Sequence, residues 1–131
     1  MMKNYLSHIL PFFFALDLII PFLLAPTYKG YSHLTQVMSV LGNSKAPLHL
    51  IYNIWLIVFG VAILISTLRL YPIVAQVSNS ISIMLFSVIV IYAIGGCILS
   101  GIFSVVETKS LETLSAKIHG YGSVIGFLLL T

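Results

Sequence analysis

Charged side chains are scarce in this sequence. Asp, Glu, Lys and Arg make up 7% of its 131 residues, whereas 60% of the residues are hydrophobic. An ordinary soluble domain is about 25% charged. A domain of this size keeps a large surface for its volume, so a water-soluble fold could not bury this much apolar surface. The scarcity of charge therefore excludes an ordinary soluble domain and predicts an integral membrane protein.

Cysteine and clustered basic residues are also lacking. The chain has one cysteine, Cys97, which lies inside an apolar stretch. A single cysteine excludes an intrachain disulfide and a thiolate-rich metal site, so we interpret Cys97 as a small packing residue. The six Lys and Arg residues are scattered singly, whereas a nucleic-acid footprint needs a basic cluster on one face. We expect no nucleic-acid partner and no cofactor.

Apolar stretches are what the sequence does contain. They are Ile9–Leu24, Leu48–Leu68, Ile81–Ile102 and Ile118–Leu130. Because roughly 20 apolar residues are needed for a helix to cross a bilayer, they predict helices over residues 5–25, 48–68, 81–102 and 116–131. The predicted fold is all-α: a polytopic transmembrane helix bundle in one domain, residues 1–131, with three full spans plus a shortened fourth. We expect the chain to be a truncated copy of a longer domain.

Prolines and a basic residue mark the expected ends of the second span. Pro47 fits its first position, where a missing N–H is not needed. Arg69 suits its carbonyl end, because a cation there complements the helix dipole. The pair Tyr71-Pro72 is expected to stop it.

Helix order predicts that two loops share one side of the membrane. Loop 1 (Thr27–Pro47) and loop 3 (Phe103–Lys117) each join an odd-numbered span to an even-numbered one. This shared side, the loop 1/loop 3 face, collects most of the titratable side chains: His33, His49, Glu107, Glu112 and His119, together with Ser39. Any polar chemistry is therefore expected at this face.

Two histidines and a carboxylate are the candidates for a reactive site. His49 and His119 each lie about one turn inside a predicted helix, and Asp17 lies near the middle of the first span. The two histidines, with either Asp17 or a loop 3 glutamate, could form a metal or acid–base site, since zinc accepts nitrogen and oxygen ligands. No H-x-x-x-H or H-E-x-x-H spacing occurs. The alternative is that the histidines are interfacial and that Asp17 is a buried hydrogen-bonding group. We assign no role to the loop residue His33.

Small and aromatic residues point to packing. Gly122 and Gly126 form a G-x-x-x-G pair, which allows close backbone approach in lipid and is compatible with a homo-oligomer. The aromatic residues near loop 1 fit a belt at the headgroup level. They are Tyr28, Tyr31, Tyr52 and Trp55.

A run of motifs resembles one membrane family. The run Tyr31–Gly42, followed by Pro47, Asn53 and Gly60, then Gly101-Ile102-Phe103 and His119, resembles the bacterial and archaeal domain of unknown function 998. Members often have an acidic residue where this chain has Val40, which puts acid-dependent chemistry at Ser39 in doubt. The resemblance implies a six-helix domain without a known reaction. It singles out Ser39, Gly42, Asn53 and His119 as candidate ligand-binding residues.

These patterns give three functional hypotheses. The leading one is a non-enzymatic, multi-pass protein of the cell membrane that binds a lipid or small ligand at the loop 1/loop 3 face. The second is a membrane hydrolase, metal-dependent or acid–base, that uses His49, His119 and Asp17, with Ser39 as a further catalytic candidate. The third is a small transporter subunit with Asp17 on a polar path. The orientation stays open, with a lean toward a cytoplasmic N-terminus.

Overall fold

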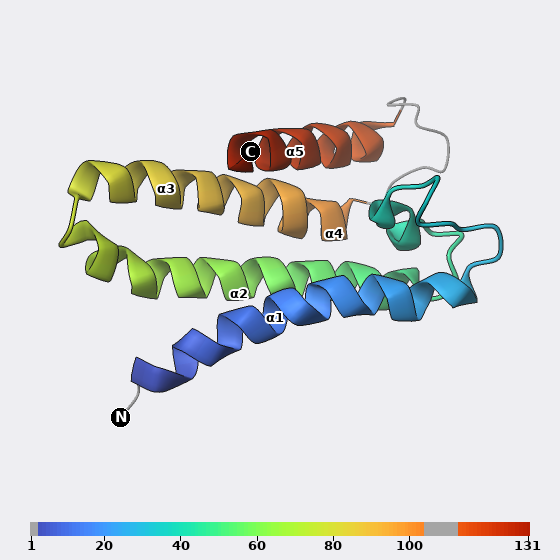
Figure 1. Cartoon of the computed structure of the whole chain (residues 1–131). Helices are drawn as coiled ribbons and strands as arrows, with labels where there is room; N and C mark the ends of the chain where they lie inside the picture. Colours follow the sequence, from blue (N-terminus) through green and yellow to red (C-terminus); the bar gives the residue numbers. More distant parts are fainter. Residues whose placement is uncertain (1–2, 104–112) are drawn as a thin grey trace.

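A computed structural model describes residues 3–103 and 113–131 of the chain (Figure 1). Its long helices are α1 (Lys3–Leu24), α2 (His49–Ala75), α3 (Asn79–Ile91) and α5 (Leu114–Leu130). Shorter elements are η1 (Ala25–Thr27), η2 (Met38–Gly42), η3 (Tyr92–Leu99) and α4 (Ser100–Ile102). No strand occurs among the described residues, so the predicted all-α class is confirmed.

Three helical segments are long and apolar enough to cross a membrane. They are Leu10–Thr27, His49–Ala75 and Asn79–Ile102, the last formed by α3, η3 and α4 in one unbroken helix. The fourth, α5, is apolar but has only 17 residues. The prediction of three full spans and a shortened fourth is therefore confirmed, and the chain is a helical membrane protein. The predicted six-helix domain is not tested.

The second span differs from the prediction at both ends. It begins at His49, so Pro47 lies outside it, and it continues through Tyr71-Pro72 to Ala75. Arg69 is therefore inside the helix and does not cap it. Pro72 removes a single backbone donor, and the bonds on either side are enough to continue the helix. The helix ends before Ser78, whose hydroxyl accepts a hydrogen bond from the Ile81 N–H and caps α3.

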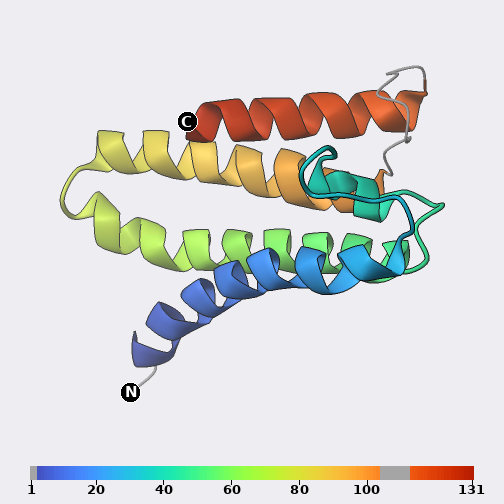
Figure 2. The same cartoon turned by 45° about the vertical axis from the view of Figure 1, so that its right-hand side comes forward.

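The helices pack side by side in a row. α1 packs on α2, α2 packs on the continuous helix of α3, η3 and α4, and α5 packs on η3. Both views place the end of α1, the start of α2, α4 and the start of α5 together, which we call the loop 1 end (Figures 1 and 2). The turn between α2 and α3 lies at the opposite, loop 2 end. Loops 1 and 3 thus start from the same end, as helix order predicts.

Glycines set the contact between α5 and η3. A Cβ atom on Gly95 would lie 2.5 Å from the Gly122 carbonyl oxygen, and one on Gly126 would lie 3.1 Å from the Gly96 backbone nitrogen. Side chains at these positions would push the two backbones apart. The G-x-x-x-G pair is therefore used inside the chain. A homo-oligomer through Gly122 and Gly126 stays an untested prediction.

Candidate functional site

Asn53 ties loop 1 to the start of α2. Its Nδ2 donates a hydrogen bond to the Gly42 carbonyl oxygen over 3.1 Å, although the residues are eleven positions apart. A Cβ atom on Gly42 would collide with Asn53 Oδ1, so a side chain there would displace the Asn53 amide. Asn53 Oδ1 itself is buried and has no hydrogen-bond partner among the described atoms. Gly42 and Asn53, two of the candidate ligand-binding residues, thus hold loop 1 against α2, and Asn53 Oδ1 remains available as a hydrogen-bond acceptor.

The same asparagine lies where α4 meets α2. A Cβ atom on Gly101 would lie 2.6 Å from the Asn53 carbonyl oxygen and 2.8 Å from the Ile57 side chain. Only glycine allows α4 this close. Asn53 therefore marks the point at which loop 1, α2 and α4 come together.

His119 joins α5 to the end of α4. Its Nδ1 lies 2.9 Å from the Phe103 carbonyl oxygen, and its side chain is only 6% exposed. One turn further along α5, Ser123 shares a 2.8 Å hydrogen bond with Ser100, whose hydroxyl donates to the Gly95 carbonyl oxygen. His119 is thus the first residue of a polar seam between α5 and the η3–α4 segment.

The other candidate histidine is held separately. His49 is half-buried, and its Nδ1 lies 2.8 Å from the Ala46 carbonyl oxygen. Among residues 3–103 and 113–131, no three His, Cys, Asp or Glu side chains gather in a group that could hold a metal ion. The structure therefore does not bring His49, His119 and Asp17 together.

The remaining candidates for that site are not joined to either histidine. Ser39 lies half-buried in η2, and no hydrogen bond links it to His49 or His119 in the described part of the chain. Glu107 and Glu112 lie outside the described residues. The metal-dependent or acid–base hydrolase stays an untested prediction.

Asp17 has an aromatic partner. Its Oδ1 accepts a 2.9 Å hydrogen bond from the Trp55 indole N–H. The Trp55 ring stacks on Phe13 at 5.7 Å and on Phe59 at 6.0 Å between ring centroids. Tyr52 is only 5% exposed and belongs to the core. The expected aromatic belt is therefore wrong for Tyr52, which the fold buries in the core, whereas for the half-buried Trp55 it stays a prediction.

His33 is the residue that sequence reasoning missed. Its ring lies against Phe22 at 4.4 Å, and its Nδ1 lies 3.0 Å from the Tyr31 hydroxyl. Partial burial raises the pKa of Tyr31, so its hydroxyl keeps its proton and can donate to Nδ1. In the tautomer that accepts this bond at Nδ1, the proton is on Nε2, a nitrogen that is buried without a partner among the described residues. The Tyr-x-His spacing was the only available signal in the sequence.

Comparison with known proteins gives a family without a known activity. The model of a family described as "Protein of unknown function (DUF998)" matches residues 14–131. The chain belongs to this family. No curated protein and no solved structure matches it. The family found by resemblance is thus confirmed. In this DUF998 protein, four of the residues on which the resemblance rested, Gly42, Asn53, Gly101 and His119, lie at joints between segments.

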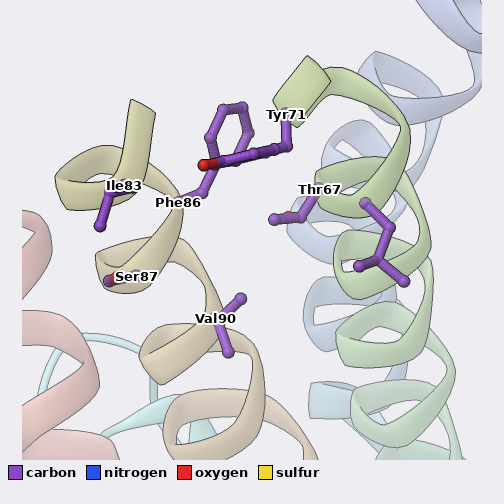
Figure 3. A pocket seen from close by; sticks show the side chains of 7 residues that line it. Thr67, Tyr71, Ile83, Phe86, Ser87 and Val90 are labelled. Carbon is purple, nitrogen blue, oxygen red and sulfur yellow. The ribbon is translucent and has the colours of Figure 1, made fainter. Parts of the chain in front are cut away.

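Two cavities lie away from these joints, in the half nearer the loop 2 end. One, of about 320 Å³, opens between α2 and α3 (Figure 3). The second, of about 340 Å³, is lined by residues of α1, α2, α3, η3 and α5. Thr67 lines both, but its hydroxyl bonds to the Ile63 carbonyl oxygen of its own helix. The cavities are therefore almost entirely apolar. An apolar groove suits a lipid chain, yet these two are not at the loop 1/loop 3 face.

Proposed function

We propose that this DUF998 protein binds the headgroup of an anionic lipid at its loop 1 end. The observation that carries the proposal is the buried Nε2 of His33, which has no hydrogen-bond partner among the described residues and is a donor when Tyr31 donates to Nδ1. Leaving such a group unpaired costs about 1–3 kcal/mol. A phosphate oxygen is a suitable acceptor. Tyr31 and Phe22 hold the ring in one orientation, and a shift of loop 1 would uncover Nε2 for this acceptor.

The surface of loop 1 supports a lipid as the ligand. Its large apolar side chains point outward: Leu34 is 95% exposed, Val37 57% and Met38 41%. Such side chains are stable at the boundary between headgroups and acyl chains. Lys29 and Lys45 are exposed on the same segment, and each cation near a membrane surface adds about 1 kcal/mol of attraction to anionic lipid. Loop 1 therefore suits contact with anionic headgroups.

Thermal unfolding in detergent tests this proposal. Cys97 is the sole cysteine and is 1% exposed, so a thiol-reactive fluorogenic dye reports when the bundle opens. A ligand that binds only the folded state raises the unfolding temperature. Phosphatidylglycerol should raise that temperature more than phosphatidylcholine does. His33→Ala should remove the difference between the two lipids.

Two arms make the test specific. Thr35→Ala, an exposed change on the same loop, should keep the preference for phosphatidylglycerol. Inorganic phosphate is the third additive, and a stabilisation equal to that of phosphatidylglycerol would assign the site to a soluble anion. That result, or an unchanged lipid preference in His33→Ala, would overturn the proposal.

A further inference from the structure

Asp17 is the one aspartate of the chain and lies deep in the first span. Counted from Leu10, the nearer end of the span, it is about 10 Å along the helix axis. An ionised side chain at this depth is costly and normally has a partner. The groups around the carboxyl group therefore decide whether it is ionised or protonated.

Among the side chains that the structure describes, residues 10–103 and 113–131, the carboxyl group of Asp17 has a hydrogen-bond donor but no cationic partner. Trp55 donates to Oδ1, and no Lys, Arg or His of the described residues forms an ion pair with the carboxyl group. The titratable groups that interact with it from neighbouring elements are Tyr52 of α2 and Tyr92 and Cys97 of η3. Each of these groups becomes negative when it ionises, so none can neutralise a carboxylate.

We propose that Asp17 is a proton-binding site within the membrane. The neutral acid accepts the Trp55 N–H through Oδ1 and carries its proton on Oδ2. Loss of the proton leaves a carboxylate that is stabilised by one indole N–H beside a wall of stacked rings, Phe13, Trp55 and Phe59. Gain and loss of a proton is thus the chemistry that this site supports, independently of lipid binding at loop 1.

A hydrophobic carbodiimide tests the protonation state directly. The carboxyl O–H adds across one C=N bond: the oxygen bonds to the central carbon and the proton goes to nitrogen. The O-acylisourea then rearranges to an N-acylurea, which keeps the full mass of the reagent and releases no leaving group. In proteoliposomes at neutral pH, mass spectrometry should find this adduct on Asp17. Labelling should fall as the pH rises and the proton is lost.

Two variants separate this site from a structural role. Asp17→Asn keeps an oxygen that accepts the Trp55 N–H, so the protein should fold and lose the adduct. Trp55→Phe keeps an aromatic ring but removes the donor that stabilises the carboxylate. Its labelling should persist to a pH about 1 unit higher, because losing a hydrogen bond to the charged form favours the acid. An Asp17 that keeps its proton at every accessible pH would not produce this shift.

The sole tryptophan provides a second readout. Trp55 emission should change with pH over the range in which labelling falls, and the change should be absent in Asp17→Asn. Absence of the adduct at neutral pH, or labelling that does not depend on pH, would overturn the proposal. Protection from labelling by sodium ions at constant pH would instead make Asp17 a metal-cation site and would also overturn it.

Discussion

At the loop 1 end, polar side chains distant in the sequence join one segment to another, whereas the loop 2 half packs around two apolar cavities and has a hydrogen bond across its turn, from the Tyr71 hydroxyl to Asn79 Oδ1. At the loop 1 end, Asn53 forms a hydrogen bond with the Gly42 carbonyl oxygen, and His119 forms one with the Phe103 carbonyl oxygen. In the loop 2 half, the Ser66 and Thr67 hydroxyls bond within their own helix. The family motif residues belong to the first group. The loop 1 end thus depends more on polar contacts between segments than the loop 2 half does.

The largest effect is expected where two backbones touch. Gly95→Ala should destabilise the protein by about 3 kcal/mol, because the new Cβ would meet the Gly122 carbonyl oxygen at 2.5 Å and α5 would have to move. The Cys97 dye assay measures the change. Gly122→Ala, whose Cβ would lie 3.1 Å from the Gly95 carbonyl oxygen, is the matched control and should cost less. Equal effects would show that α5 is loosely packed.

A double-mutant cycle sharpens the role of the loop 1 joint. Gly42→Ala should cost about 2 kcal/mol, since its Cβ collides with Asn53 Oδ1. Asn53→Ala removes the collision along with the hydrogen bond. In the double variant, Gly42→Ala should therefore cost much less than it does alone, as measured by unfolding with the same dye. Strict additivity would mean that the two residues are not in contact.

Removal of the imidazole of His119 should cost about 1–2 kcal/mol. His119→Phe keeps a ring of similar size but leaves the Phe103 carbonyl oxygen without its partner. Ser123→Ala, one turn further along the same seam, should cost less because Ser100 still bonds to Gly95. Chemical denaturation in detergent micelles compares the two variants. A larger loss in Ser123→Ala would place the main joint deeper in the membrane.

The smallest effect is expected beside the cavities. Thr67→Val should change stability by less than about 0.5 kcal/mol, because the lost hydroxyl bonds only to its own helix and the added methyl group enters apolar surroundings. Its unfolding temperature should match that of the unmodified protein. A loss comparable to that of His119→Phe would remove the contrast between the two ends.

The sequence predicted the helices better than their ends. Hydrophobicity located three full spans and a shortened fourth, because a helix that crosses lipid needs a long apolar segment. It failed at Arg69 and Tyr71-Pro72, where a local stop signal was outweighed by the helical bonds on either side. Proline has a smaller effect in membrane helices than the rules for soluble helices suggest.

The site was predicted by region and not by residue. Helix order correctly placed the loops joined to His49 and His119 at one end. The two rings have separate partners, however: the Ala46 carbonyl oxygen for His49 and the Phe103 carbonyl oxygen for His119. His33 was overlooked, although it has the buried nitrogen without a partner. The rotation of a helix and the path of a loop decide such pairings, and neither leaves a regular pattern in the sequence.

The sequence by itself determined that this protein lies in a membrane and that its polar residues gather at one end, because length, hydrophobicity and helix order are properties of the chain. Only the tertiary structure decided that Asp17 contacts Trp55 and that Gly122 contacts Gly95. It also decided that Nε2 of His33 is buried without a hydrogen-bond partner among the described residues. Contacts of 3 Å between distant segments depend on how whole helices rotate and shift against each other. That arrangement is set by packing over the entire bundle.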